Sequence, residues 1–396
     1  MSLPPLISAA LITKNEERNL ASCLTSLQGL VDEVIVVDTG SSDKTVEIAE
    51  EYGARIFHHP WRDDFADARN VSLDKANGSW ILYIDADERV SGITRAQLEL
   101  DLANPENVAY RVWLQPRVNS TAYREYRLWR SDPRIRFDGI IHERVVPAIH
   151  EVASREGKSI GLSELSLLHV GYEGDQTEKN IRNLPLLRRQ IILDPTNLFV
   201  RYHLAKVLGD MGEVEESEKI LESTVAYVRG LELRDPVASL SFLELIRRYL
   251  QRGESADDLI QDAHSRFPGN LGLLWIEARS LIATGRYAEA LVVLKKYTDI
   301  VGQGLSSPND PAYDRRLLGE LPWDSAGLCH FKIGNFVEAA AAYQEAALRA
   351  EDPTPYISKR AIALAKISKD LSNTNDDHPV LPESGRSIFK LKDRGI

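Results

Sequence analysis

The sequence predicts an α/β domain with a mostly parallel sheet, followed by an all-α domain of helical repeats. Two observations lead to this fold class. Over residues 6–90, short β-branched and apolar runs alternate with segments in which apolar residues recur at helical spacing. From about residue 180, recurring glycine-centred turns between helical segments replace the strand-like runs. Repeated strand, turn and helix indicate a parallel sheet with helices on both faces.

The first 90 residues contain four expected strands with helices between them. Asn15 is expected to cap the first helix, because Glu16 and Glu17 would then lie in its first turn. Further along, two segments alternate polar and apolar residues and indicate antiparallel or edge strands, 110–114 and 126–130. The four earlier strands are 6–13, 33–38, 55–58 and 81–84, and the later two helices between them are 44–52 and 67–77.

Polar residues follow three of these strands at the point where each strand ends, in segments 13–16, 38–41 and 85–87. Parallel strands bring their carboxyl ends to one rim, so these segments predict a pocket for a phosphorylated and hydroxylated ligand. Side chains alternate along an extended chain, so Asp85 and Asp87 are expected on the same side. Two such carboxylates suit Mg or Mn, although a strand that simply ends in a polar turn would look the same.

Composition restricts the classes of protein that remain. The length of 396 residues favours two domains, and the net charge of −11 argues against general affinity for nucleic acid. We expect a cytoplasmic chain with no transmembrane segment, because no apolar run approaches bilayer-spanning length. Cys23 and Cys329 are expected to be reduced and packed. The glycine fingerprint of dinucleotide-binding folds and the P-loop are both missing after the first strand.

Four motifs occur in order, each at an expected strand or helix end: residues 11–17, 36–45, 68–70 and 85–87. Together they resemble the family 2 glycosyltransferases, whose nucleotide-sugar-binding fold is called GT-A. A nucleotidyltransferase of similar architecture would carry a glycine-rich basic loop after the first strand, and residues 13–17 do not form one. The resemblance is strongest over residues 6–90 and loosens toward the C-terminus.

The resemblance implies a nucleotide-diphosphate sugar, most simply a UDP-sugar, in the predicted pocket. Thr39 stands where many family members have an acidic residue, so the side chain that contacts the base stays open between Asp38 and Thr39. The alternative interpretation of both residues is structural: Asp38 stabilises its own turn, and Arg69 pairs with a nearby acid among residues 63–67. The residues implied to contact the nucleotide are Thr13, Asn15, Glu16, Asp38, Thr39, Arg69 and Asp85.

The same resemblance implies a divalent cation, Mn or Mg, with Asp87 as its direct ligand. A histidine would complete the metal shell, either His169 in the segment 167–172 or His142 in the segment 135–143. In an inverting transfer a carboxylate accepts the acceptor's proton, and Glu143 is the candidate, with Asp138 as the alternative. Glu143 in a purely structural role is the competing interpretation. The basic residues of 179–189 would offer cations to the diphosphate, or form a solvated helix face.

The four helical turns begin at Gly212, Gly253, Gly285 and Gly334, and the last two resemble the tetratricopeptide repeat. In that repeat small residues let paired helices approach closely. Residues 302–321 are expected to form an inserted loop. The repeats would bind a protein partner, an acceptor protein or a second copy of the chain on their concave face, or only cover the catalytic domain.

These inferences give a GT-A catalytic domain over residues 1–178, a repeat domain over 179–370 and a flexible tail over 371–396. The predicted activity is metal-dependent, inverting transfer of a sugar to a saccharide, lipid-linked or peptide acceptor. The alternative is an inactive nucleotide-sugar-binding scaffold that acts through its repeats. The sugar and the acceptor are left open by the sequence.

Overall fold

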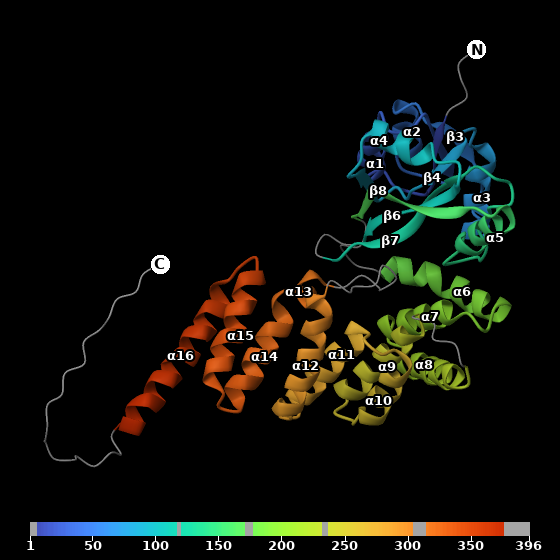
Figure 1. Ribbon diagram of the computed structural model, residues 1–396. Coiled ribbons are helices and arrows are strands. Elements are labelled where there is room, and N and C mark those ends of the chain that lie inside the picture. The colour runs from blue at the N-terminus through green and yellow to red at the C-terminus, as the bar shows by residue number, and fades with distance from the viewer. Residues whose placement is uncertain (1–5, 117–119, 171–176, 232–236, 304–313, 376–396) are drawn as a thin grey trace, which may run out of the picture.

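The computed structural model describes residues 6–116, 120–170, 177–231, 237–303 and 314–375, with side chains described as far as residue 368. Figure 1 shows two parts, a sheet-containing N-terminal part and a row of helices that extends away from it. Helix α6 (Thr177–Leu193) begins where the two parts meet.

Eight strands of the described chain form one sheet in the order β3-β2-β1-β4-β7-β6-β8-β5. The strands β3, β2, β1 and β4 are parallel, as the alternation of strands and helices predicted. Strand β7 then pairs with β4 and β6 in antiparallel fashion, so the sheet as a whole is mixed. The strands are β1 (Ile7–Thr13), β2 (Glu33–Asp38), β3 (Arg55–His58), β4 (Trp80–Tyr83), β5 (Glu88–Ser91), β6 (Asn107–Gln115), β7 (Tyr123–Arg130) and β8 (Ser159–His169).

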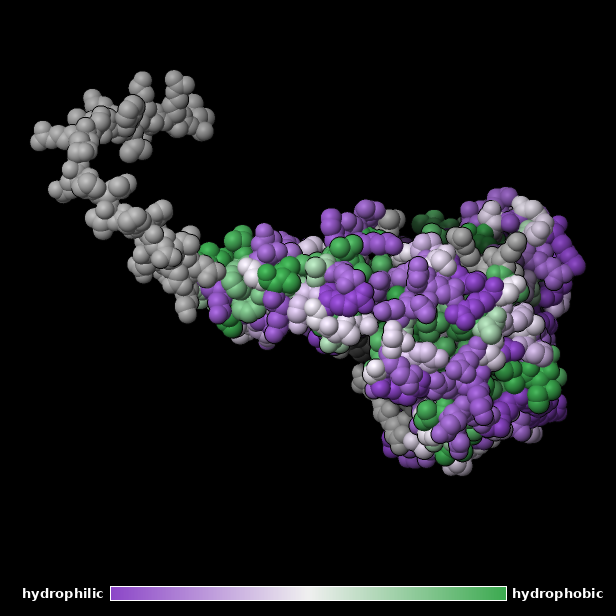
Figure 2. Space-filling view, turned by 90° about the horizontal axis from the view of Figure 1, so that it is seen from below, coloured by the Kyte–Doolittle hydropathy of each residue, from purple (hydrophilic) through white to green (hydrophobic). Residues whose placement is uncertain are grey.

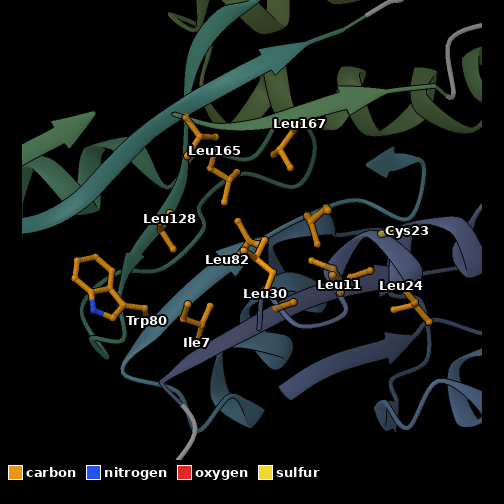
Figure 3. Packing of buried hydrophobic residues seen from close by; sticks show 14 of the residues in the cluster. Ile7, Leu11, Cys23, Leu24, Leu30, Trp80, Leu82, Leu128, Leu165 and Leu167 are labelled. Atoms are coloured by element: carbon orange, nitrogen blue, oxygen red, sulfur yellow. The ribbon is translucent and has the colours of Figure 1, made fainter. Parts of the chain in front are cut away.

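Helices cover both faces of the sheet, as its apolar strands require. On one face, Leu11 and Leu82 of the sheet pack in one cluster with Leu24 of α1, and Figure 3 shows this cluster. On the other face, Ile81 packs in a second cluster with Ile149 of α5. Full burial of each such side chain contributes about 1.5–3 kcal/mol. The covering helices are α1 (Leu20–Leu27), α2 (Thr45–Glu51), α3 (Phe65–Lys75), α4 (Arg95–Leu102) and α5 (Val146–Glu156).

The predicted cap of the first helix is wrong. Helix α1 begins at Leu20 with Asn19 at its cap, and its first turn contains no acidic residue. Asn15 instead adopts a left-handed backbone conformation with φ 56°, which asparagine tolerates better than most residues. Its side-chain oxygen accepts a hydrogen bond from the backbone N–H of Ser42 at 2.8 Å. Asn15 therefore connects the loops after β1 and β2.

In the helical part, consecutive helices lie side by side, and several of the described connections are short turns. Gly212, Gly253, Gly285 and Gly334 lie in four of these turns with φ of 90°, 74°, 74° and 85°, a region that glycine enters without strain. The helices are α6, α7 (Leu198–Asp210), α8 (Val214–Arg229), α9 (Ala238–Gln251), α10 (Asp257–Arg266), α11 (Leu271–Ala283), α12 (Tyr287–Gly302), α13 (Arg315–Leu318), α14 (Glu320–Lys332), α15 (Phe336–Arg349) and α16 (Thr354–Asn375).

Two boundaries in the helical part differ from the predicted ones. Helix α16 continues to Asn375, past the expected start of the tail, and residues 376–396 lie outside the described chain. The expected loop over 302–321 is shorter, because α13 and the first turn of α14 occupy its end; residues 304–313 are not described. Cys23 and Cys329, which were predicted to be reduced and packed, are both buried and free. Within the described ranges, no helix is long and apolar enough to cross a bilayer.

Candidate functional site

The ends of β1, β2 and β4 meet at a pocket of about 450 Å³, which we call the donor pocket. Its volume lies in the range typical of small-molecule sites. Helix α6 closes one side with Lys179 and Arg182. Most of the residues predicted from the sequence to contact a nucleotide or metal line this pocket, namely Thr13, Glu16, Thr39, Arg69, Asp85, Asp87 and His169.

Asp38 and Asn15 have structural positions beside the donor pocket and do not line it. The Asp38 carboxylate accepts hydrogen bonds from the backbone N–H groups of Gly40 at 3.1 Å and Ser41 at 3.2 Å. This geometry matches the turn-stabilising alternative considered for Asp38. Thr39, the next residue, does line the pocket, and its hydroxyl donates to the carbonyl of Thr13 at 2.9 Å.

Arg69 of α3 connects two carboxylates from distant parts of the chain. Its Nη2 lies 3.0 Å from Asp85 Oδ1, and its Nε donates to Glu143 Oε1. In place of the alternative local pairing with the acids of residues 63–67, Arg69 pairs with these two distant carboxylates: Asp64 caps α3, and Asp67 bonds to His59 at 2.7 Å. The long-range arrangement fixes both carboxylates, since the guanidinium is planar and offers donors in a rigid fork.

Two guanidinium groups lie against the ring of Tyr83. The Arg69 and Arg127 carbons are 4.3 Å and 4.2 Å from its centroid, and its hydroxyl donates to Asp85 Oδ2 at 3.2 Å. Burial raises the pKa of Tyr83, so the phenol keeps its proton and remains a donor. Burial also opposes ionisation of Asp85, but Arg69 and Arg127 outweigh it and lower the Asp85 pKa to about 2. Asp85 is therefore a carboxylate held by hydrogen bonds from Arg69 and Tyr83 and by an ion pair with Arg127 at 3.7 Å.

Arg127 and Glu88 form a buried ion pair beneath this arrangement. Arg127 Nη2 lies 2.9 Å from Glu88 Oε1, and Glu88 Oε2 accepts from the backbone N–H of Asp85 at 2.9 Å. Sequence reasoning assigned no role to either residue. A signal was present: in the expected strand 126–130, Arg127 stands between Tyr126 and Leu128, and a charge buried in such a strand requires a partner.

Two buried nitrogens of this cluster, Arg69 Nη1 and Arg127 Nε, have no hydrogen-bond partner among the described residues. Aromatic rings cover the Arg69 guanidinium instead, Tyr83 on one side and Phe137 at 5.7 Å. Cation–π attraction replaces part of the hydration that these groups lose on burial.

Asp87 and His169 form the part of the donor pocket that suits a metal. His169 Nε2 and Asp87 Oδ2 are 2.8 Å apart, held by the pairing of β5 with β8 and by a hydrogen bond from Val170 N–H to the Asp87 carbonyl at 2.9 Å. No group of three or more His, Cys, Asp or Glu side chains suited to a metal occurs in the described ranges. A cation held by Asp87 and His169 would need further oxygen ligands from a bound molecule or water.

The other candidate metal ligand, His142, has a different environment. It adopts a left-handed conformation with φ 52°. Its ring packs against His203 at 4.1 Å and meets Phe199 edge to face at 5.1 Å, both from α7. Burial lowers the pKa of His142 to about 4. His142 thus contacts the helical part of the chain and does not line the donor pocket.

A second cavity of about 780 Å³ adjoins the donor pocket, and Phe65 and Arg69 line both. Glu143 lines this second cavity, which we call the junction cavity because β7, α7 and α8 all contribute to it. Asp138, the alternative proton acceptor, is exposed and lines neither space; its backbone forms an isolated bridge with Arg144. The site geometry therefore favours Glu143 over Asp138.

Comparison with known proteins assigns the N-terminal part to a family. Residues 8–143 match the model of glycosyl transferase family 2. A TPR repeat-containing protein of Synechococcus elongatus is 31% identical over 54% of this chain and 55% of its own length. Glycosyltransferase SunS, prophage-derived in Bacillus subtilis, is 25% identical over 56% of this chain and 53% of its own length.

A lipopolysaccharide core biosynthesis glycosyltransferase, LpsC of Rhizobium meliloti, is 32% identical over 41% of this chain and 62% of its own length. The chain spans about half the length of the first two curated relatives. Among solved structures, a glucosyl-3-phosphoglycerate synthase of Mycobacterium tuberculosis, crystallised with Mn²⁺ and UDP-glucose, covers 46% of this chain and 77% of its own at 18% identity and a TM-score of 0.36.

These findings define the class of domain. Residues 8–143 belong to a family 2 glycosyltransferase domain with a GT-A fold, and the chain joins this domain to a helical repeat region.

Proposed function

We propose that this chain is a glycosyltransferase that moves a sugar from a nucleoside diphosphate to an acceptor. The observation that carries the proposal is the position of Arg69, which binds Asp85 in the donor pocket and Glu143 in the adjoining junction cavity. A transfer reaction needs a donor site and a proton acceptor side by side. Arg69 holds Asp85 of the donor pocket and Glu143, a candidate proton acceptor, at the wall between the donor pocket and the junction cavity.

The donor pocket suits a UDP-sugar. Thr13, Glu16 and Thr39 offer hydrogen-bonding groups to a base and ribose at the ends of β1 and β2. Asp85, ionised and fixed by Arg69 and Tyr83, is suited to bind a ribose hydroxyl. Lys179 and Arg182 of α6 line the opposite side and supply positive charge for a diphosphate.

Asp87 and His169 are the residues that would hold Mn²⁺ or Mg²⁺, because a carboxylate oxygen and an imidazole nitrogen lie together on the pocket wall. The cation would supply positive charge near the departing diphosphate. His142 has no part in this role, given its contacts with α7.

Glu143 is the proposed proton acceptor. As the acceptor's nucleophilic atom attacks the anomeric carbon, its proton passes to Glu143, and the bond from that carbon to the diphosphate oxygen breaks. The nucleoside diphosphate leaves with the bonding electron pair, and attack from the side opposite the leaving group inverts the anomeric configuration. Arg69 binds Oε1 of Glu143 and so orients the carboxylate.

The test is release of nucleoside diphosphate from a panel of UDP-sugars in the presence of Mn²⁺. We expect Asp87→Ala to abolish release, and Glu143→Gln to lower it about 100-fold while UDP still binds. Asp74→Ala is the matched control, because Asp74 forms only an exposed pair with Arg136 at 2.7 Å. Binding of nucleotide sugars without any turnover by the wild type would instead favour the inactive scaffold.

A further inference from the structure

We propose that the junction cavity binds the acceptor, and that the acceptor is an unphosphorylated polypeptide segment; this inference rests on the proposed function. Glu143 faces the cavity from the catalytic domain, and the helical part supplies the opposite wall. Its lining residues include Tyr126, Glu143, Val146, Thr196, Phe199 and Tyr227.

The two walls belong to different parts of the chain. Tyr126 of β7 and Val146 at the start of α5 form the catalytic wall, while Phe199 of α7 and Tyr227 of α8 form the helical wall. Contact between His142 and Phe199, with ring centroids 5.1 Å apart, joins the walls at one side of the cavity. An acceptor that reaches Glu143 through this space therefore touches the repeat region as well.

The charges around the cavity argue against a phosphorylated acceptor. Arg127 is paired with Glu88 at 2.9 Å, and Arg69 is paired with Asp85 and Glu143. Arg144 lies 3.7 Å from Asp194, and Glu125 adds a further carboxylate to the lining. A phosphate would have to compete with these carboxylates for each arginine, so an acceptor segment without phosphate fits this cavity better.

The surface of the cavity favours a peptide over a saccharide. Val145, Val146 and Ile141 line one side, and Leu198 and Phe199 line the other. Such side chains gain free energy by covering apolar groups, which a peptide carries in its side chains and a hydroxyl-rich saccharide largely lacks. The volume of about 780 Å³ is within the range of sites that enclose drug-sized ligands.

The reacting group would be a serine or threonine hydroxyl or a cysteine thiol of the segment. Its hydrogen passes to Glu143 as a proton while its oxygen or sulfur forms the bond to the anomeric carbon. The bond from that carbon to the diphosphate breaks, and the nucleoside diphosphate takes the electron pair, so no further reactant is needed.

Two variants of the helical wall test the inference without touching the donor pocket. Tyr227→Ser removes a ring that is 36% exposed, and Thr196→Trp fills space from an exposed turn position. Tyr52→Ser is the matched control, because Tyr52 is also 36% exposed but lines neither cavity. The substrates are the donor turned over by the wild type and short synthetic peptides with Ser, Thr or Cys, their phosphorylated forms, and neutral oligosaccharides.

We expect unphosphorylated peptides to accelerate release of nucleoside diphosphate and to gain the mass of one sugar. Tyr227→Ser and Thr196→Trp should raise the peptide KM about tenfold and leave hydrolysis of the donor unchanged, while Tyr52→Ser matches the wild type. Acceleration by oligosaccharides or phosphopeptides alone, or wall variants with unaltered peptide KM, would overturn the inference. Failure of the wild type to bind or hydrolyse any donor would overturn the proposed function as well.

Discussion

At the scale of single residues, Tyr83 decides how Asp85 is held. Its hydroxyl contributes one hydrogen bond to Asp85, and its ring lies against the guanidinium groups of Arg69 and Arg127. These two contributions can be separated by substitution, because Phe keeps the ring and loses the hydroxyl, whereas Leu loses both.

We expect Tyr83→Phe to lower the free energy of unfolding by about 1.5 kcal/mol, the value of a hydrogen bond to a charged group. Tyr83→Leu should cost about 3 kcal/mol or more, because two buried arginines also lose their aromatic cover. Urea denaturation of both variants measures these differences. Equal losses would show that the ring contributes nothing beyond its hydroxyl.

Arg69 is the residue whose replacement should separate charge from geometry. Lysine keeps the positive charge but cannot reach Asp85 and Glu143 with donors in a fixed fork. We therefore expect Arg69→Lys to lower the rate of sugar transfer about 100-fold, because Glu143 loses its orientation. Steady-state kinetics with the donor that the wild type turns over measures the loss, and Arg136→Lys, at an exposed ion pair, should match the wild type.

The candidate site was predictable where short motifs determine it. Thr13, Thr39, Asp85 and Asp87 lie at the end of a strand or within a few residues after it, and the parallel order of those strands brings them to one pocket. The partners of Arg69 could not be predicted in this way, because Glu143 is 74 residues away along the chain. Local acids offered nearer partners in sequence, and only the folded sheet shows that they bind elsewhere.

At the scale of elements, the parallel half of the sheet and the repeat turns were predictable, since both depend on local periodicity. The start of α1 was not, because Asn15 bonds to Ser42 across 27 residues and leaves the helical conformation to do so. The two candidate histidines differ for a similar reason. The register of β5 with β8 brings His169 to Asp87, while His142 packs against a helix of the other part.

The close contact of α14 with α15 depends on a small residue. A Cβ on Gly327 would lie 2.6 Å from the buried ring of Tyr343, whereas one on Gly302, at the end of α12, would meet nothing within 4 Å. We expect Gly327→Ala to lower the free energy of unfolding by about 1–3 kcal/mol through overpacking. Thermal or urea denaturation measures the change.

Gly302→Ala is the control for helix propensity, and it should be neutral or stabilise by up to about 1 kcal/mol. If both variants were equally stable, close packing at Gly327 would not be the constraint that holds these two helices together.

At the scale of the whole molecule, two neutral histidines lie at the contact between the catalytic and helical parts, His142 on the catalytic side and His203 on the helical side. Burial lowers the pKa of His142 to about 4, and burial, His142 and Lys206 together lower the pKa of His203. Both imidazoles are thus uncharged in the folded protein at neutral pH. In the unfolded chain they titrate near the ordinary value of 6.5, so the two states bind different numbers of protons below that pH.

The unfolded chain binds more protons in this window, so the free energy of unfolding should fall as the pH decreases from about 6.5 toward 4, by up to about 1.4 kcal/mol per pH unit for each imidazole. Above 6.5 the two histidines contribute no pH dependence. Urea denaturation across the window measures the slope. His203→Gln removes one of the two titrating groups and should reduce the slope by about half of the histidine contribution.

The variant also separates this effect from the carboxylates, which titrate in both proteins alike. If wild type and His203→Gln lost stability with the same slope, the histidines would be protonated equally in the folded and the unfolded state. The contact between the two parts would then have to open to water before the chain unfolds. A reduced slope, in contrast, means that α7 stays against His142 until global unfolding, which is the rigidity that a junction cavity shared by both parts requires.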